Sequence, residues 1–171
     1  ATTPTGGRLR AMSELTERCF GPVRFLPGPN RGKYPFCHSL YVEADRCVVI
    51  DPASDRQRLA ALREGPGVDE VWLSHYHEDH LTNLDLFEDL PLRISAADAP
   101  ALASLEAFHD AYGIHEPELR EQWSFLLQKM FNFRPRVAAA TFDGDEVIDL
   151  GGVTVQVLSL IHISEPTRLR R

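Results

Sequence analysis

The 171-residue sequence contains no apolar run of 18 residues and no excess of basic side chains. A helix that crosses a bilayer needs about 20 predominantly apolar residues, so the sequence predicts no membrane span. Lys and Arg number 18 against 25 Asp and Glu, which gives a formal net charge of −7. This balance is unlike the basic footprint of nucleic-acid-binding proteins. The two absences predict a soluble protein that binds neither nucleic acid nor membrane.

Cysteine is also scarce, with Cys19, Cys37 and Cys47 as the three examples and no C-x-x-C pair among them. An odd number without that spacing argues against a disulfide framework and against a structural zinc knuckle. The first residues, Ala1-Thr2, open a stretch that lacks the charged and apolar regions of a secretory signal. We therefore expect reduced thiols and a cytoplasmic location.

A chain of this length with 43% hydrophobic residues predicts one domain or part of one. Residues 1–13 are small, polar and rich in Gly and Pro, so we expect a loose lead-in before a domain over residues 14–158. Short apolar runs predict strands at residues 23–26, 39–43, 47–50, 68–73, 92–95, 137–142, 147–150 and 153–158. Longer periodic stretches predict helices at residues 55–64, 81–87, 98–112 and 116–132. Strands that alternate with helices indicate an α/β fold.

The densest group of chemically reactive side chains lies in residues 74–80, directly after a predicted strand. The segment reads Ser-His-Tyr-His-Glu-Asp-His and holds three of the seven histidines. Residues two apart on an extended segment point the same way, so His75 and His77 can present their imidazoles to one metal ion. Asp79 and His80 follow where the chain turns into a helix, and they can face a second ion. The segment predicts a metal site at the end of a strand.

Neutral imidazole and carboxylate ligands suit zinc, and they also suit iron or manganese. A bound metal lowers the pKa of water from 15.7 toward about 7, and two ions about 3.5–4 Å apart also clamp attacking and leaving oxygens. Asp79 is a candidate catalytic residue, because its carboxylate can both ligate a metal and orient a hydroxide. Tyr76 and Glu78 receive no role and are expected to face solvent or to pack.

Residues 71–80 closely resemble the hallmark motif of the metallo-β-lactamase-fold hydrolases, a superfamily that includes glyoxalase II-like enzymes. The upstream run 48–52 (VVIDP) resembles the strand of that family that ends in an aspartate. The resemblance covers about residues 25–158. It implies the N-terminal half of an αββα sandwich, with a mixed sheet and flanking helices.

The same resemblance implies roles for five residues. His75 and His77 would ligate the first metal ion, and Asp79 and His80 would ligate the second. Asp51 would hydrogen-bond behind these ligands and support them. The complete enzyme would hold two zinc ions, with iron or manganese as possible replacements.

The sequence departs from the family pattern in its last third. The family completes its site with a Gly-His pair, a bridging aspartate and a final histidine. His162 is the one late histidine; it has no glycine beside it, and no aspartate follows it. Residues 158–168 (LSLIHISEPTR) resemble the translation of a common sequencing-library transposon adapter. We expect a C-terminally truncated fragment with an incomplete site and a non-native tail at residues 159–171, with a native amphipathic tail as the alternative.

The leading functional prediction is a metal-dependent hydrolase that acts on a small-molecule thioester, ester or lactone. Phosphodiesterases and nucleases share the fold, and the acidity of the chain disfavours a nuclease. An iron-dependent oxidoreductase of sulfur compounds or oxygen is one alternative, and an inactive metal-binding fragment is another. The helical segment 112–133 is expected to pack on the core, or else to cap a substrate entrance. A chain that lacks the second half of the sandwich would expose apolar faces, which predicts marginal stability.

Overall fold

The computed structural model describes residues 15–158. The predicted lead-in over residues 1–13 and the predicted tail over residues 159–171, with His162, lie outside this range. Within it, no helix combines the length and the apolar character that a bilayer span requires.

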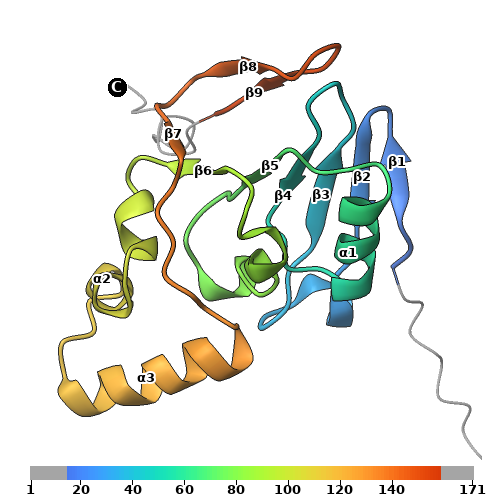
Figure 1. Ribbon diagram of the computed structural model, residues 1–171. Coiled ribbons are helices and arrows are strands. Elements are labelled where there is room, and N and C mark those ends of the chain that lie inside the picture. Colours follow the sequence, from blue (N-terminus) through green and yellow to red (C-terminus); the bar gives the residue numbers. More distant parts are fainter. Residues whose placement is uncertain (1–14, 159–171) are drawn as a thin grey trace, which may run out of the picture.

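A seven-stranded mixed sheet forms the centre of the fold (Figure 1). Its strands lie side by side in chain order: β1 (Arg18–Phe20), β2 (Val23–Leu26), β3 (Ser39–Val42), β4 (Val48–Ile50), β5 (Glu70–Trp72), β6 (Leu92–Ser95) and β7 (Ala140–Phe142). Strands β1 to β4 pair antiparallel, whereas β4 to β7 pair parallel. Parallel neighbours require crossover connections, which explains why every helix after β4 lies between two parallel strands. The predicted α/β class with a mixed sheet is confirmed.

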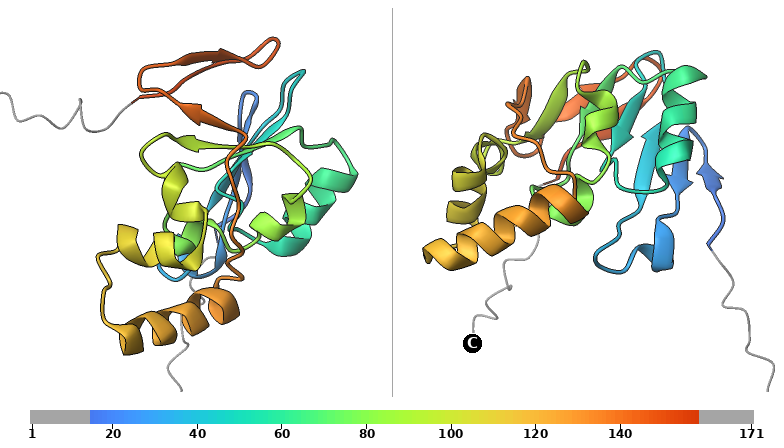
Figure 2. Two further views of the ribbon diagram at one scale, coloured as in Figure 1. Left: turned by 60° about the vertical axis from the view of Figure 1, so that its left-hand side comes forward. Right: turned by 60° about the horizontal axis from the view of Figure 1, so that its bottom comes forward.

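The α-helices are α1 (Arg56–Glu64), α2 (Leu105–Ala111) and α3 (Pro117–Met130). Four short 3₁₀ helices accompany them: η1 (Pro29–Gly32), η2 (Glu78–His80), η3 (Leu84–Phe87) and η4 (Ala99–Leu102). A separate hairpin of β8 (Val147–Asp149) and β9 (Thr154–Gln156) follows β7. The helices gather on one side of the sheet and this hairpin lies on the other (Figures 1 and 2).

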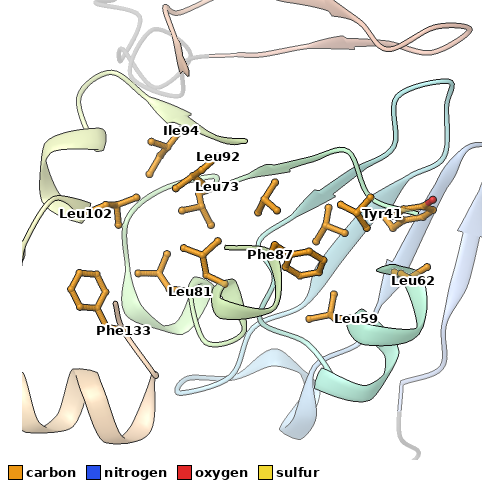
Figure 3. Close-up of a cluster of buried hydrophobic side chains, with 14 of the residues drawn as sticks. Tyr41, Leu59, Leu62, Leu73, Leu81, Phe87, Leu92, Ile94, Leu102 and Phe133 are labelled. Carbon is orange, nitrogen blue, oxygen red and sulfur yellow. The ribbon is translucent and has the colours of Figure 1, made fainter. Parts of the chain in front are cut away.

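Alternating side chains of the strands supply two hydrophobic clusters, one on each face of the sheet. Val49 of β4 and Val71 of β5 belong to the larger cluster beneath the helices. Figure 3 shows this cluster, with Leu59 and Phe87 among its labelled side chains. Trp72, the next residue along β5, points to the opposite face and joins the smaller cluster with the β8–β9 hairpin. Because strand side chains alternate between faces, β4 and β5 are buried on both sides. This burial fixes the position of their carboxyl ends.

Some elements differ from the sequence-based expectation. The helix predicted over residues 98–112 is interrupted at Ser104, whose backbone is extended (φ −158°, ψ 168°). Its hydroxyl accepts a hydrogen bond from the backbone N–H of Ala107 (3.0 Å), so Ser104 starts α2 anew as an N-cap. The helix predicted over residues 81–87 is instead the single 3₁₀ turn η3, and η2 lies just before this range. Strand β1 was not predicted, because its three residues are exposed and carry no alternating pattern.

Helix α3 packs with only part of the apolar stripe that its sequence predicts. Leu127 is fully buried, and Phe131, directly after the helix, is 1% exposed. Leu119 and Met130, from the two ends of the same stripe, are exposed. The helix therefore packs on the larger cluster through its C-terminal half.

Candidate metal centre

The carboxyl ends of β4 and β5 bring Asp51 and Ser74 together, because parallel strands end at the same edge of a sheet. Asp51 has φ +51°, a left-handed conformation that aspartate tolerates better than most residues. Its backbone N–H donates to the carbonyl of Trp72 (2.9 Å), and its carbonyl accepts from the hydroxyl of Ser39 (2.5 Å). The backbone of Asp51 is thus fixed from both neighbouring strands.

The buried carboxylate of Asp51 accepts hydrogen bonds from Ser74 and contacts His80. The Ser74 backbone N–H donates to Oδ1 and its hydroxyl donates to Oδ2, each over 2.8 Å. Oδ2 also lies 2.9 Å from Nδ1 of His80. A carboxylate against Nδ1 orients the imidazole and leaves Nε2 as the nitrogen available to a metal.

Ser74 also selects the tautomer of His75. A serine hydroxyl has one hydrogen, and Ser74 gives it to Asp51, so it accepts from Nδ1–H of His75 across 2.9 Å. Nε2 of His75 then carries the lone pair, and it faces Nδ1 of His77 at 2.9 Å. Two imidazole nitrogens at this separation share a proton or a cation.

The structure therefore brings the predicted ligands together. The ring centroid of His75 lies 4.5 Å from that of His77 and 4.1 Å from that of His80. Oδ2 of Asp79 lies 3.8 Å from Nε2 of His80. These side chains offer imidazole and carboxylate donors, which are the ligand types that divalent transition metals bind.

The electrostatic surroundings act on two of these imidazoles in opposite directions. Burial lowers the pKa of His75, and the neighbouring His80 and His77 lower it further. Burial also lowers the pKa of His80, but hydrogen bonds with Asp51 and Cys37 outweigh that effect and raise the pKa to about 10. A metal that binds His80 must displace its proton, so metal affinity at this site depends on pH.

Cys37 is a neighbour of the centre that the sequence pattern did not single out. Its Sγ lies 3.5 Å from Nδ1 and 3.7 Å from Nε2 of His80. Ligand atoms of Cys37, Asp51 and His80 all lie within 4.8 Å of one another. The antiparallel pairing of β3 with β4 could have indicated this neighbour. The residues just before β3 lie beside the residues just after β4, where Asp51 is.

Glu78 is buried, so of the two expectations for it, solvent exposure or packing, the structure shows packing. Its carboxylate accepts a hydrogen bond from the hydroxyl of Tyr34 (2.9 Å) and another from the hydroxyl of Tyr112. Tyr34 precedes β3 and Tyr112 follows α2, so the carboxylate ties two distant segments to the motif. Tyr76 packs at its ring edge against Phe108 and Tyr112, in agreement with the expected packing role.

A family model described as the metallo-beta-lactamase superfamily matches residues 35–163 of the chain. No curated protein matches the chain significantly.

Several solved structures share the fold. The metallo-beta-lactamase MIM-2 gives a TM-score of 0.57 at 18% identity, with 82% of this chain and 50% of that chain covered. GOB-18 from Elizabethkingia meningoseptica gives 0.54 at 15% identity, with 92% and 55% covered. A mutant metallo-beta-lactamase from Cronobacter sakazakii gives 0.52 at 18% identity, with 80% and 50% covered. The chain spans about half the length of these structures. With a family model that covers most of its length, the chain belongs to the metallo-beta-lactamase superfamily.

Proposed function

We propose that the chain carries the metal-binding motif of a metal-dependent hydrolase. In this proposal His75 and His77 ligate one zinc ion, Asp79 and His80 ligate a second, and Asp51 supports them from behind. The observation that carries it is that His75 faces His77 and Asp79 lies beside Nε2 of His80, while Asp51 and Ser74 fix the orientation of His80 and His75.

Zinc, when bound, supplies Lewis acidity for a carbonyl and lowers the pKa of water. The protein's own groups provide the orientation that this chemistry requires. Asp51 holds His80 through Nδ1, and Ser74 holds His75 through Nδ1, so that each presents Nε2. Asp79 lies beside His80 with its carboxylate partly accessible, where it can accept a proton from water and direct the attack.

A thioester, ester or lactone is the substrate class that we propose. Hydrolysis of these groups at a carbonyl requires no cationic surface, whereas a nucleic-acid phosphodiester favours one. The net charge of −7 therefore favours the carbonyl substrates.

Metal analysis tests the first step of the proposal. The purified chain, loaded with zinc and dialysed, is expected to retain zinc, and the double variant His75→Ala/His77→Ala is expected to lose most of it. His115→Ala is the matched control, because His115 is exposed and lies outside the motif. Equal zinc content in all three proteins would refute the site.

A substrate panel tests the second step. Zinc-dependent hydrolysis of a model thioester, aryl ester or lactone is expected, and Asp79→Asn is expected to lower kcat by about 100-fold. Stoichiometric iron together with oxygen consumption would replace the hydrolase with an oxidoreductase. Zinc binding with no turnover of any panel member would leave a metal-binding fragment.

A further inference from the structure

We propose that the thiolate of Cys37 is a ligand of the metal ion that His80 binds, so that this position carries a sulfur donor beside imidazole and carboxylate. The inference rests on the proposed metal site and adds to it a residue outside the His75–His80 motif. It is carried by the position of Cys37, by the distances around His80 and by the hydrogen bonds that Asp51 already makes to Ser74.

The loop that holds Cys37 is packed closely enough to fix the position of this residue. A Cβ atom built on Gly28 would lie 1.9 Å from the carbonyl oxygen of Cys37, so only glycine permits this approach. The backbone N–H of Gly28 also donates to Nδ1 of His38 over 3.0 Å. Ser39, two residues after Cys37, accepts hydrogen bonds at its hydroxyl from the backbone N–H groups of Ala53 and Ser54. The backbone around Cys37 is therefore held in place, whereas its side chain is not tied to a strong partner.

Sγ of Cys37 lies near both ring nitrogens of His80, 3.5 Å from Nδ1 and 3.7 Å from Nε2, and the second distance fits two ligands of one ion. Zinc binds histidine nitrogen at about 2.1 Å and thiolate sulfur at about 2.3 Å, and tetrahedral geometry then separates the two ligand atoms by about 3.6 Å. The observed separation of Sγ from Nε2 of His80 is 3.7 Å. Oδ2 of Asp79 lies 3.8 Å from the same nitrogen. Cys37 and Asp79 are thus each placed at about ligand spacing from Nε2 of His80.

Asp51 is the third member of the close group, but its oxygens are already in use. Oδ1 accepts from the backbone N–H of Ser74, and Oδ2 accepts from its hydroxyl and faces Nδ1 of His80. Cys37 has weaker ties, because its sulfur has only long contacts, with the carbonyl of His38 over 3.3 Å and with the ring nitrogens of His80 over 3.5 and 3.7 Å. The sulfur is free to exchange its hydrogen for a metal, and the proton is released to solvent as the bond to the metal forms.

A sulfur donor changes which metals the site prefers. Thiolate is a soft ligand that selects zinc over magnesium, calcium or manganese. The manganese alternative that imidazole and carboxylate leave open is therefore disfavoured at this position.

Cobalt(II) substitution provides the test, because thiolate ligation adds an intense near-ultraviolet charge-transfer band that imidazole and carboxylate ligands lack. The full chain is titrated with cobalt(II) under reducing conditions, alongside Cys37→Ser and the matched control Cys19→Ser, which alters an exposed cysteine. The band is expected in the wild-type chain and in Cys19→Ser, and it is expected to vanish in Cys37→Ser. Circular dichroism of Cys37→Ser, together with retained visible d–d bands, shows that the variant is folded and still binds cobalt.

Two other outcomes would overturn different parts of the proposal. Visible cobalt bands without a charge-transfer band in the wild type would overturn the ligand role of Cys37 and leave the His75–His80 site intact. Absence of any protein-bound cobalt spectrum would overturn both the ligand role and the proposed metal site. If Cys37 is a ligand, its replacement by serine also weakens zinc binding by more than the roughly 10–100-fold that loss of an outer-shell partner costs.

Discussion

Oδ2 of Asp51 lies 2.9 Å from Nδ1 of His80, and the same carboxylate receives both hydrogen-bond donors of Ser74. One side chain at the end of β4 thus orients the last histidine of the motif and Ser74, two residues after β5. Because the carboxylate is buried, this contact is little screened by water. The geometry gives Asp51 a positioning role for the whole centre.

The variant Asp51→Asn tests that role. The amide keeps the size of the side chain but removes the negative charge that holds His80, so zinc affinity is expected to fall by about 10–100-fold. Competition titration against a chromophoric chelator measures the change. Asp89→Asn is the control, since Asp89 is an exposed partner of Arg63 on the surface. Affinities equal to wild type in both variants would show that Asp51 does not support the ligands.

The stability of the metal-free protein is expected to depend on pH through His80. Its pKa is about 10 in the folded chain and about 6.5 in an unfolded one. A raised folded-state pKa means that the folded protein binds more protons between these values. The stabilisation is therefore complete below about pH 6.5 and is lost as pH rises toward 10, by at most about 1.4 kcal/mol per pH unit.

Urea unfolding between pH 6.5 and 10 with a chelator present measures this slope. Cysteine and tyrosine also titrate in the range, so the informative quantity is the difference between wild type and His80→Gln. The wild type is expected to lose stability more steeply than the variant. Parallel slopes would contradict the raised pKa.

Glu78 is expected to contribute to stability through its two tyrosine partners. Glu78→Ala would leave the hydroxyls of the exposed Tyr34 and the half-buried Tyr112 without their acceptor, at a cost of about 1 kcal/mol in the free energy of unfolding. Chemical denaturation measures the loss, with the exposed Glu121→Ala as control. If the two variants unfold at the same denaturant concentration, the buried carboxylate has no net structural role.

The residues of the centre differ in how far the sequence alone could indicate them. His75, His77, Asp79 and His80 could be grouped in advance because they are local, and the spacing along one segment determines which side chains face the same way. Asp51 is 23 residues upstream of Ser74, and only the parallel pairing of β4 with β5 makes them neighbours. Its assignment therefore depended on a family resemblance.

Cys37 and Glu78 were missed because their environment is set by tertiary packing. Cys37 reaches His80 across 43 positions of sequence, through a loop whose path depends on the close approach at Gly28. Glu78 occupies a motif position that sequence reasoning treats as variable, yet tyrosines from two distant segments contact it.

The fold class was easier to predict from the sequence than these contacts, since alternating apolar strands and helices indicate layering without any knowledge of individual contacts. The break at Ser104 shows the limit of predicting helix boundaries from sequence, because a single serine can cap a new helix inside an apparently continuous helical pattern.

The loop before β3 offers a final prediction that does not alter any ligand. In Gly28→Ala the new methyl group would meet the carbonyl oxygen of Cys37 at 1.9 Å, so the backbone at Cys37 must move. Because the metal ligands in residues 75–80 are untouched, the variant is expected to bind cobalt(II) with a diminished thiolate charge-transfer band. Gly65→Ala is the control, since its added methyl group has no neighbour nearer than 3.0 Å, at the end of α1. A full-strength band in Gly28→Ala would show that this close approach does not set the position of the sulfur.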